Sequence, residues 1–158
     1  DFPMPLLRAA LSWNFVLATA ICASLLAQLI KVLLNLFIFH RFIAERMWGA
    51  GGMPSSHSAT VCAMVVATGR YCGVNSPIFA IAAVLSIIVM YDAMGVRYET
   101  GEQAKVLNRM FTEWMDQGFE QFQLPHGKKL KEMVGHTPIE VVTGAALGIV
   151  LGFAMPMV

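Results

Sequence analysis

The sequence predicts an all-α fold, a multi-pass transmembrane helical bundle that forms one membrane domain over residues 1–158. Hydrophobic residues make up 57% of the chain and charged residues only 13%, whereas soluble domains carry about 25% charged residues. A soluble domain of this length still needs a polar surface, and this chain has too few polar residues to supply one. Four apolar stretches of helical length are the predicted spans, at residues 15–39, 56–71, 77–94 and 139–158.

The composition also excludes several classes of protein and site. A net charge of +1 argues against a nucleic-acid partner. The cysteines Cys22, Cys62 and Cys72 lie within or at the ends of apolar runs without metal-ligand spacing, so we expect small hydrophobes and neither disulfides nor a metal. The first residues lack the pattern of a cleavable signal peptide, and because the sequence starts at Asp1 rather than Met, we expect residues upstream of it.

The first apolar stretch carries a polar stripe. Ser24, Gln28, Lys31 and Asn35 follow one another at spacings of four, three and four, which places them on one helical face. A lysine in such a segment is costly in lipid unless it faces protein or water. Snorkelling to the interface is the alternative, but Lys31 lies about 12 Å of helix from Phe39. We therefore predict that the stripe faces inward.

The stretch Gly51-Gly52-Met53-Pro54-Ser55-Ser56-His57-Ser58-Ala59 lies directly before the second apolar stretch. Ser55 or Ser56 can cap the helix that follows Pro54. The N-terminus of a helix attracts anions, so two hydroxyls and His57 at this end predict a phosphate site with a proton donor beside it. Capping alone, with no ligand, is the alternative interpretation.

The last apolar stretch begins beside a second histidine. His136 and Glu140 are four residues apart, so they share a helical face if the helix begins by His136. A carboxylate bonded to one imidazole nitrogen leaves the other free, which is how a nucleophilic or basic histidine is oriented. The alternative is that His136 caps the helix and Glu140 is an interfacial charge. Gly144, Gly148 and Gly152 form a stripe for close helix packing, either internal or in a homo-oligomer.

Residues 98–135 are the one polar block, and apolar residues repeat through it near the helical period. These are Val106, Leu107, Met110, Phe111, Trp114, Met115, Phe119 and Phe122. The pattern predicts an amphipathic helical insertion that lies on the membrane surface or closes over the bundle. Asp92, just before the block, pairs with Arg97 or Lys31, or else takes part in a metal or phosphate site.

With four spans, the first and third connections emerge on the same membrane face, which brings His57, His136 and the cations together. Basic residues are also asymmetric, with eight on this face, two (Arg8 and Arg70) on the other, and Lys31 within a span. By the positive-inside rule, the face that carries the motifs is predicted to be cytoplasmic.

These residues resemble the motifs of the type 2 phosphatidic acid phosphatase superfamily, which includes lipid phosphatases and vanadium haloperoxidases. The whole chain looks like the small membrane family described as its divergent branch. Pro54-Ser55-Ser56-His57 resembles the second motif, Pro-Ser-Gly-His. His136-Thr137-Pro138-Ile139-Glu140 resembles His-x-x-x-Asp of the third motif.

Arg97 is similar to the arginine of the third motif, although the polar block separates it from His136. Lys31 and Arg41 resemble the first motif only loosely, because no proline follows Arg41. Ser56 stands where the superfamily has glycine, and Glu140 stands where it has aspartate.

The resemblance implies a phosphatidic acid phosphatase-like core and a hydrolase. In it, His136 is the nucleophile, Glu140 orients His136, and His57 is the acid and base. Ser55, Ser56, Arg97 and Lys31 bind the phosphate, and Asp92, Asn35 and Gln28 support the site. It needs no cofactor, and its substrate is an amphiphilic phosphorylated lipid, phosphatidate-like or polyprenyl.

Three other functions stay open at this stage. One is a non-catalytic binding or transport module for a phospholipid or polyprenyl phosphate. Another is a metal-dependent phosphotransferase that uses Asp92, Glu99 and Glu102. A third is a structural membrane subunit assembled through the glycine stripe.

Overall fold

The computed structural model of the chain describes residues 14–39, 52–118, 129–132 and 134–157, and every regular element within them is an α-helix. The helices are α2 (Phe15–Phe39), α4 (Ser56–Cys72), α5 (Pro77–Met94), α6 (Val96–Asp116) and α7 (Pro138–Ala154). The predicted all-α class is therefore confirmed. The predicted lead-in with Trp13 and the basic residues Arg8, Arg41 and Lys128 lie outside the described residues.

The helices begin and end close to the predicted ranges, with one correction. The last helix was expected to continue to Val158, but α7 ends at Ala154. Met155, which precedes Pro156, has an extended backbone with ψ of 127°. The residue before a proline is driven out of the helical region by the proline ring, so the helix ends there although the sequence stays apolar.

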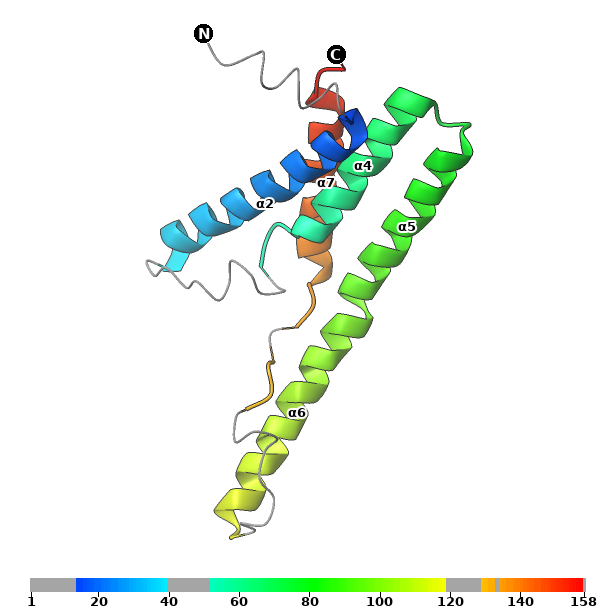
Figure 1. Cartoon of the computed structure of the whole chain (residues 1–158). Helices are drawn as coiled ribbons and strands as arrows, with labels where there is room; N and C mark the ends of the chain where they lie inside the picture. The colour runs from blue at the N-terminus through cyan, green and yellow to red at the C-terminus, as the bar shows by residue number, and fades with distance from the viewer. Residues whose placement is uncertain (1–13, 40–51, 119–128, 133, 158) are drawn as a thin grey trace.

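Close packing of α4 against α7 forms the centre of the bundle (Figure 1). Gly144, Gly148 and Gly152 of α7 are buried. A side chain at Gly144 would meet the backbone of Ser55, and one at Gly148 would meet the backbone of Ala59. The glycine stripe therefore serves packing inside the chain, and any homo-oligomer would need another surface.

Small residues also form the contact between α2 and α4. Ala23 and Ala27 of α2 are completely buried against Ala59 and Ala63 of α4. The opposite face of α2 exposes a row of large apolar residues four apart, namely Leu17, Ile21, Leu25, Leu29 and Leu33. Small residues inside and large apolar residues outside are typical of helices packed in a membrane.

Two helical runs within the described residues are long and apolar enough to cross a membrane, Phe15–Phe37 and Pro77–Asp116, and the second joins α5 and α6 across Gly95. The remaining two, α4 and α7, have 17 residues each. At 1.5 Å per residue they are about 25 Å long, close to the lower limit for a span.

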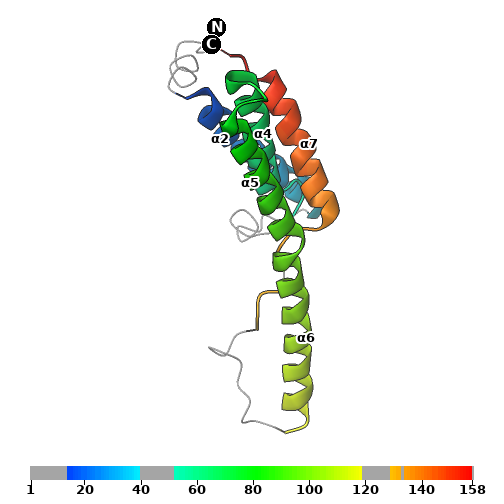
Figure 2. The same cartoon turned by 90° about the vertical axis from the view of Figure 1, so that its right-hand side faces the viewer.

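The described helix of the polar block, α6, does not close over the bundle. After a break at Gly95, α6 continues the line of α5 and projects beyond the other helices, as Figure 2 shows. Among the described helices, α6 contacts α5 alone. The described residues 129–132 run beside α6, and 134–137 lead into α7 (Figure 1).

Substituting the central glycine tests whether the close approach of α4 and α7 holds the fold. We expect Gly148→Leu to lower the thermal midpoint of the protein in detergent, because the new side chain meets the backbone of Ala59. Overpacking of this kind costs about 1–3 kcal/mol. The matched control is Ala146→Leu, which places the same side chain at an exposed position of the same helix. Equal thermal midpoints for the two variants would contradict the prediction.

Candidate functional site

Four segments that are distant in the sequence meet at one end of the bundle. The amide of Ser55, before α4, donates to the carbonyl of Glu140 in the first turn of α7 at 3.0 Å. The amide of His136 donates to the carbonyl of Ala93 near the end of α5, also at 3.0 Å. From α2, the side chain of Lys31 lies against Gly52, where a Cβ would be 3.5 Å from its Cδ.

Ser55 is the residue that caps α4. Its hydroxyl oxygen accepts hydrogen bonds from the backbone N–H of Ser58 at 3.3 Å and from the Ser58 hydroxyl at 3.1 Å. Ser55 is completely buried, and Ser56, the first helical residue, is 7% exposed. The capping function predicted for this stretch is therefore present. A direct contact between Ser55 and an anion would have to use its remaining O–H.

The two histidines face each other at the start of α4 and α7. The ring centroids of His57 and His136 are 6.0 Å apart, and the ring planes are inclined at 59°. His57 is exposed, whereas His136 is 2% exposed. The site thus pairs one imidazole that solvent reaches with one that the protein encloses.

His136 is held by its Nδ1, which lies 3.2 Å from Oε2 of Glu140. Its Nε2 is buried and has no hydrogen-bond partner among the described residues. Burial lowers the pKa of His136 below its usual range, and the bond to Glu140 opposes this shift without overcoming it. In the neutral ring, a proton on Nδ1 donated to Glu140 leaves the lone pair of Nε2 available for reaction.

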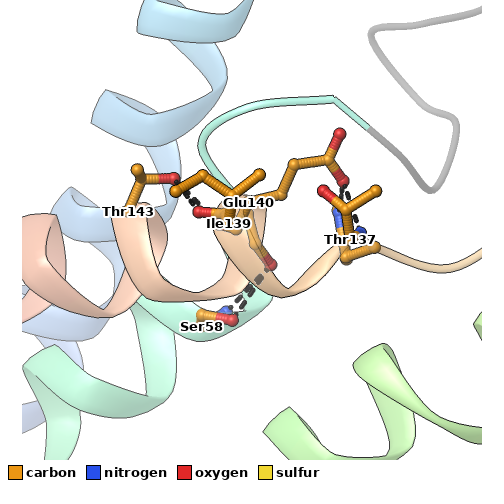
Figure 3. Close-up of polar contacts among 7 residues, drawn as sticks. Ser58, Thr137, Ile139, Glu140 and Thr143 are labelled. Carbon is orange, nitrogen blue, oxygen red and sulfur yellow. Dashed lines mark hydrogen bonds and ion pairs between the residues drawn. The ribbon is translucent and has the colours of Figure 1, made fainter.

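Glu140 has a second function in the same place. Its Oε2 also accepts from the backbone N–H of Thr137 at 3.1 Å, so it completes a capping box at the start of α7. Figure 3 shows its carboxylate turned back toward Thr137. One carboxylate therefore fixes both the start of α7 and the orientation of His136.

Two cations lie near the histidines, in different surroundings. Lys31 is only 2% exposed and is close enough to Glu140 and His136 for their charges to interact. Arg97 is near His57, but its Nε donates to Oδ2 of Asp92 at 2.7 Å. The predicted pairing of Asp92 with Arg97 is confirmed, and both side chains are about half exposed.

The other polar residues of α2 are less clearly connected to the site. Gln28 lies one turn farther from the loop than Lys31, and its buried Oε1 has no partner among the described residues. Asn35 is partly buried.

Sequence reasoning missed the residues that hold the backbone at His136. The carbonyl of Ala93 is free to accept because the helix breaks at Gly95. Gly135 has a φ of +87° and packs against the backbone of Arg97 and Tyr98. A glycine directly before the histidine was the available signal. Sequence reasoning also missed Asn108, because no local pattern in the sequence reveals its hydrogen bonds to Leu130.

Comparisons of the sequence with known proteins identify a family. Residues 12–151 match the model of the Divergent PAP2 family. The chain is also 38% identical over 144 residues to the "Uncharacterized membrane protein YuiD" of Bacillus subtilis (strain 168), an alignment that covers 87% of this chain and 91% of the relative. No solved structure matches. The family match spans most of the sequence and includes every described residue of the site, so the chain belongs to the Divergent PAP2 family.

Proposed function

We propose that this protein is a membrane lipid phosphate phosphatase that hydrolyses a phosphomonoester or diphosphate of an amphiphilic substrate through a phosphohistidine intermediate. The observation that carries the proposal is the approach of the two imidazole rings to 6.0 Å. One ring has a buried nitrogen without a partner among the described residues, and the other is exposed. A single phosphoryl group is small enough to contact both.

The proposed reaction has two steps. In the first, the lone pair of His136 Nε2 attacks phosphorus, the bond from phosphorus to the leaving oxygen breaks, and His57 donates a proton to that oxygen. In the second, His57 takes a proton from water as the water oxygen attacks phosphorus, and the P–N bond breaks and returns its electrons to His136. Glu140 stabilises the positive imidazole ring through Nδ1 in both steps.

Charge near the rings supports binding of an anion. Lys31 is a buried cation, and burying an ammonium group is costly unless negative charge is close. Glu140 supplies one negative charge, and the phosphoryl oxygens would supply more. The N-terminus of α4, capped by Ser55, adds the positive end of its helix dipole.

The substrate class follows from where the site lies. It is at the end of helices whose outer faces expose leucine, isoleucine and valine. A phosphorylated headgroup can reach the histidines from this position while its acyl or polyprenyl tail stays in the lipid. Both phosphatidate-like and polyprenyl substrates satisfy this geometry.

Two observations favour a second candidate, a binding or transport module without turnover. Arg97 is engaged by Asp92, and the Ser55 hydroxyl is used as a cap. The metal-dependent alternative has less support, because Glu102 pairs with Lys105 at 2.6 Å and the described residues contain no group of three potential metal ligands.

Substitution of each histidine tests the mechanism. Protein purified in detergent with EDTA should release phosphate from phosphatidate or a polyprenyl diphosphate. We expect His136→Ala to abolish release because it removes the nucleophile, and His57→Ala to slow it roughly 10²–10⁴-fold because it removes acid–base catalysis.

The matched control is His126→Ala, since His126 stands between Pro125 and Gly127, a sequence typical of an exposed turn. Wild-type protein quenched in alkali during turnover should carry an acid-labile phosphoryl group that the His136→Ala variant lacks. Full activity in the His136→Ala variant would remove His136 as the nucleophile, and binding of the lipid phosphate without release would favour the module.

The pH profile tests the role of Glu140. Neutral His136 is the reactive form, and burial lowers its pKa. Activity should therefore fall in acid only at pH values below the pKa of an ordinary histidine, which is about 6.5. Because Glu140 raises this pKa, Glu140→Gln should move the acid limb to still lower pH. The same change should lower kcat roughly 10²-fold or more, since the charge that stabilises the imidazolium is lost. A shift of the limb to higher pH would contradict the assignment.

The proposal also places the motif end on the cytoplasmic side, on the basis of the basic residues. Cys72 provides a native probe, because it is exposed at the opposite end of α4. A membrane-impermeant maleimide added to intact cells should label the wild-type chain and not the Cys72→Ser variant. Labelling of Cys72 only after the membrane is permeabilised would reverse the orientation.

A further inference from the structure

The imidazole of His136 is held by Glu140, but the backbone that carries it needs a separate explanation. His136 lies between α7 and the segment 129–135, which forms no regular secondary structure in its described residues. A segment of this kind has few local hydrogen bonds to hold it. The position of His136 therefore depends on what the segment contacts.

The segment runs along one stripe of the α5–α6 rod. Residues 93, 97, 101, 104 and 108 follow one another at spacings of four, four, three and four, which is one face of a helix. Ala93, Ala104 and Asn108 on this face are no more than 7% exposed. The stripe is thus covered at these residues and at Gly101, although α6 projects away from the other helices, whereas the side chain of Arg97 is about half exposed.

The segment contacts the stripe in sequence order, with later residues of the segment lying against earlier residues of the rod. A Cβ at Gly101 would lie 2.6 Å from the carbonyl oxygen of Glu132 and 3.0 Å from that of Val134. Gly135 packs on the backbone of Arg97 and Tyr98. These close approaches are possible because both residues are glycine. At the end of the stripe, Ala93 accepts the amide hydrogen of His136.

Asn108 supplies side-chain hydrogen bonds at the far end of this stripe. Its Nδ2 donates to the carbonyl oxygen of Leu130 at 2.9 Å and to Oε1 of Glu132 at 2.7 Å. Its Oδ1 accepts from the backbone N–H of Leu130 at 2.8 Å. The amide thus pairs with both backbone polar groups of Leu130, as a neighbouring strand would, and it is only 4% exposed.

We propose that Asn108 is a positioning residue for His136, which acts by fixing the segment 130–136 against the α5–α6 rod. The glycine contacts set how close the segment lies, and Asn108 sets its register along the helix. If the segment shifts at Leu130, the amide of His136 loses its place on Ala93, and water gains access to the imidazole. The consequence for catalysis rests on the proposed function, but the positioning itself does not.

The test uses the full chain in detergent micelles and two NMR observables at His136. In Asn108→Asp, a carboxylate faces the carbonyl of Leu130 and the carboxylate of Glu132, so two attractive contacts become repulsive. We expect the amide hydrogen of His136 to exchange about tenfold faster or more. The imidazole of His136 should titrate closer to the ordinary histidine value as water reaches it.

Two controls separate a local effect from a general loss of structure. Exchange of the Gly148 amide, in the α4–α7 contact, should not change in Asn108→Asp. Asn75→Asp makes the same chemical change at an exposed turn at the other end of the bundle and should leave both His136 observables as in the wild type. A folded Asn108→Asp protein with unchanged exchange and titration at His136 would overturn the proposal.

If Asn108→Asp does not fold, a milder variant tests whether Asn108 positions His136. Glu132→Ala removes one of the three bonds of Asn108 at an exposed residue, and it should shift both observables in the same direction by a smaller amount. No change at His136 in Glu132→Ala would then overturn the proposal. Neither observable requires turnover, so failure of the proposed phosphatase activity would leave this result interpretable.

Discussion

The approach of α4 to α7 determines the geometry of the site. Because three glycines of α7 present no side chains to α4, the two backbones come close enough for the amide of Ser55 to reach the carbonyl of Glu140 at 3.0 Å. That bond places the first turns of the two helices side by side. His57 lies two residues after Ser55 and His136 lies four before Glu140, so the same contact brings the two rings to 6.0 Å. The distance between the histidines is therefore a consequence of how the bundle is packed.

In a membrane bundle whose interior consists of small residues, the orientation of helices and side chains depends strongly on hydrogen bonds. The core between α2 and α4 consists largely of alanine, and large apolar side chains face outward. Lipid tails are as apolar as leucine, so burial of apolar surface gives little preference for one helix arrangement over another. Orientation near the site depends on specific polar contacts, which is why Glu140 can act on a ring and on a helix start at once.

The sequence predicted most of the helices and part of the site, for identifiable reasons. Proline and glycine limit the apolar stretches, so the helix starts at Ser56, Pro77 and Pro138 could be located closely. The spacing of His136 and Glu140 pointed to their contact on the premise that the helix begins by His136, but α7 begins at Pro138, and the contact forms because the capping-box carboxylate of Glu140 reaches back past Thr137. Local sequence patterns could not predict the direction of α6 or the pairing of Asn108 with Leu130. That pair is separated by 22 residues, and an asparagine in an amphipathic helix has no periodic signal that identifies its partner.

Three departures of this chain from the superfamily motifs have a structural explanation. Ser56 replaces a glycine at a helical position, where no positive φ is required. Glu140 is the third residue of α7, where a capping box uses glutamate to reach back to the cap, and the same reach brings its carboxylate to His136. The polar block separates Arg97 from His136 in sequence, but the chain leaves the bundle at Arg97 and returns at Gly135, which packs on the backbone of Arg97. An excursion whose ends meet can be long without disturbing what lies at its base. The changed motif spacing is therefore compatible with an intact arrangement of the two histidines.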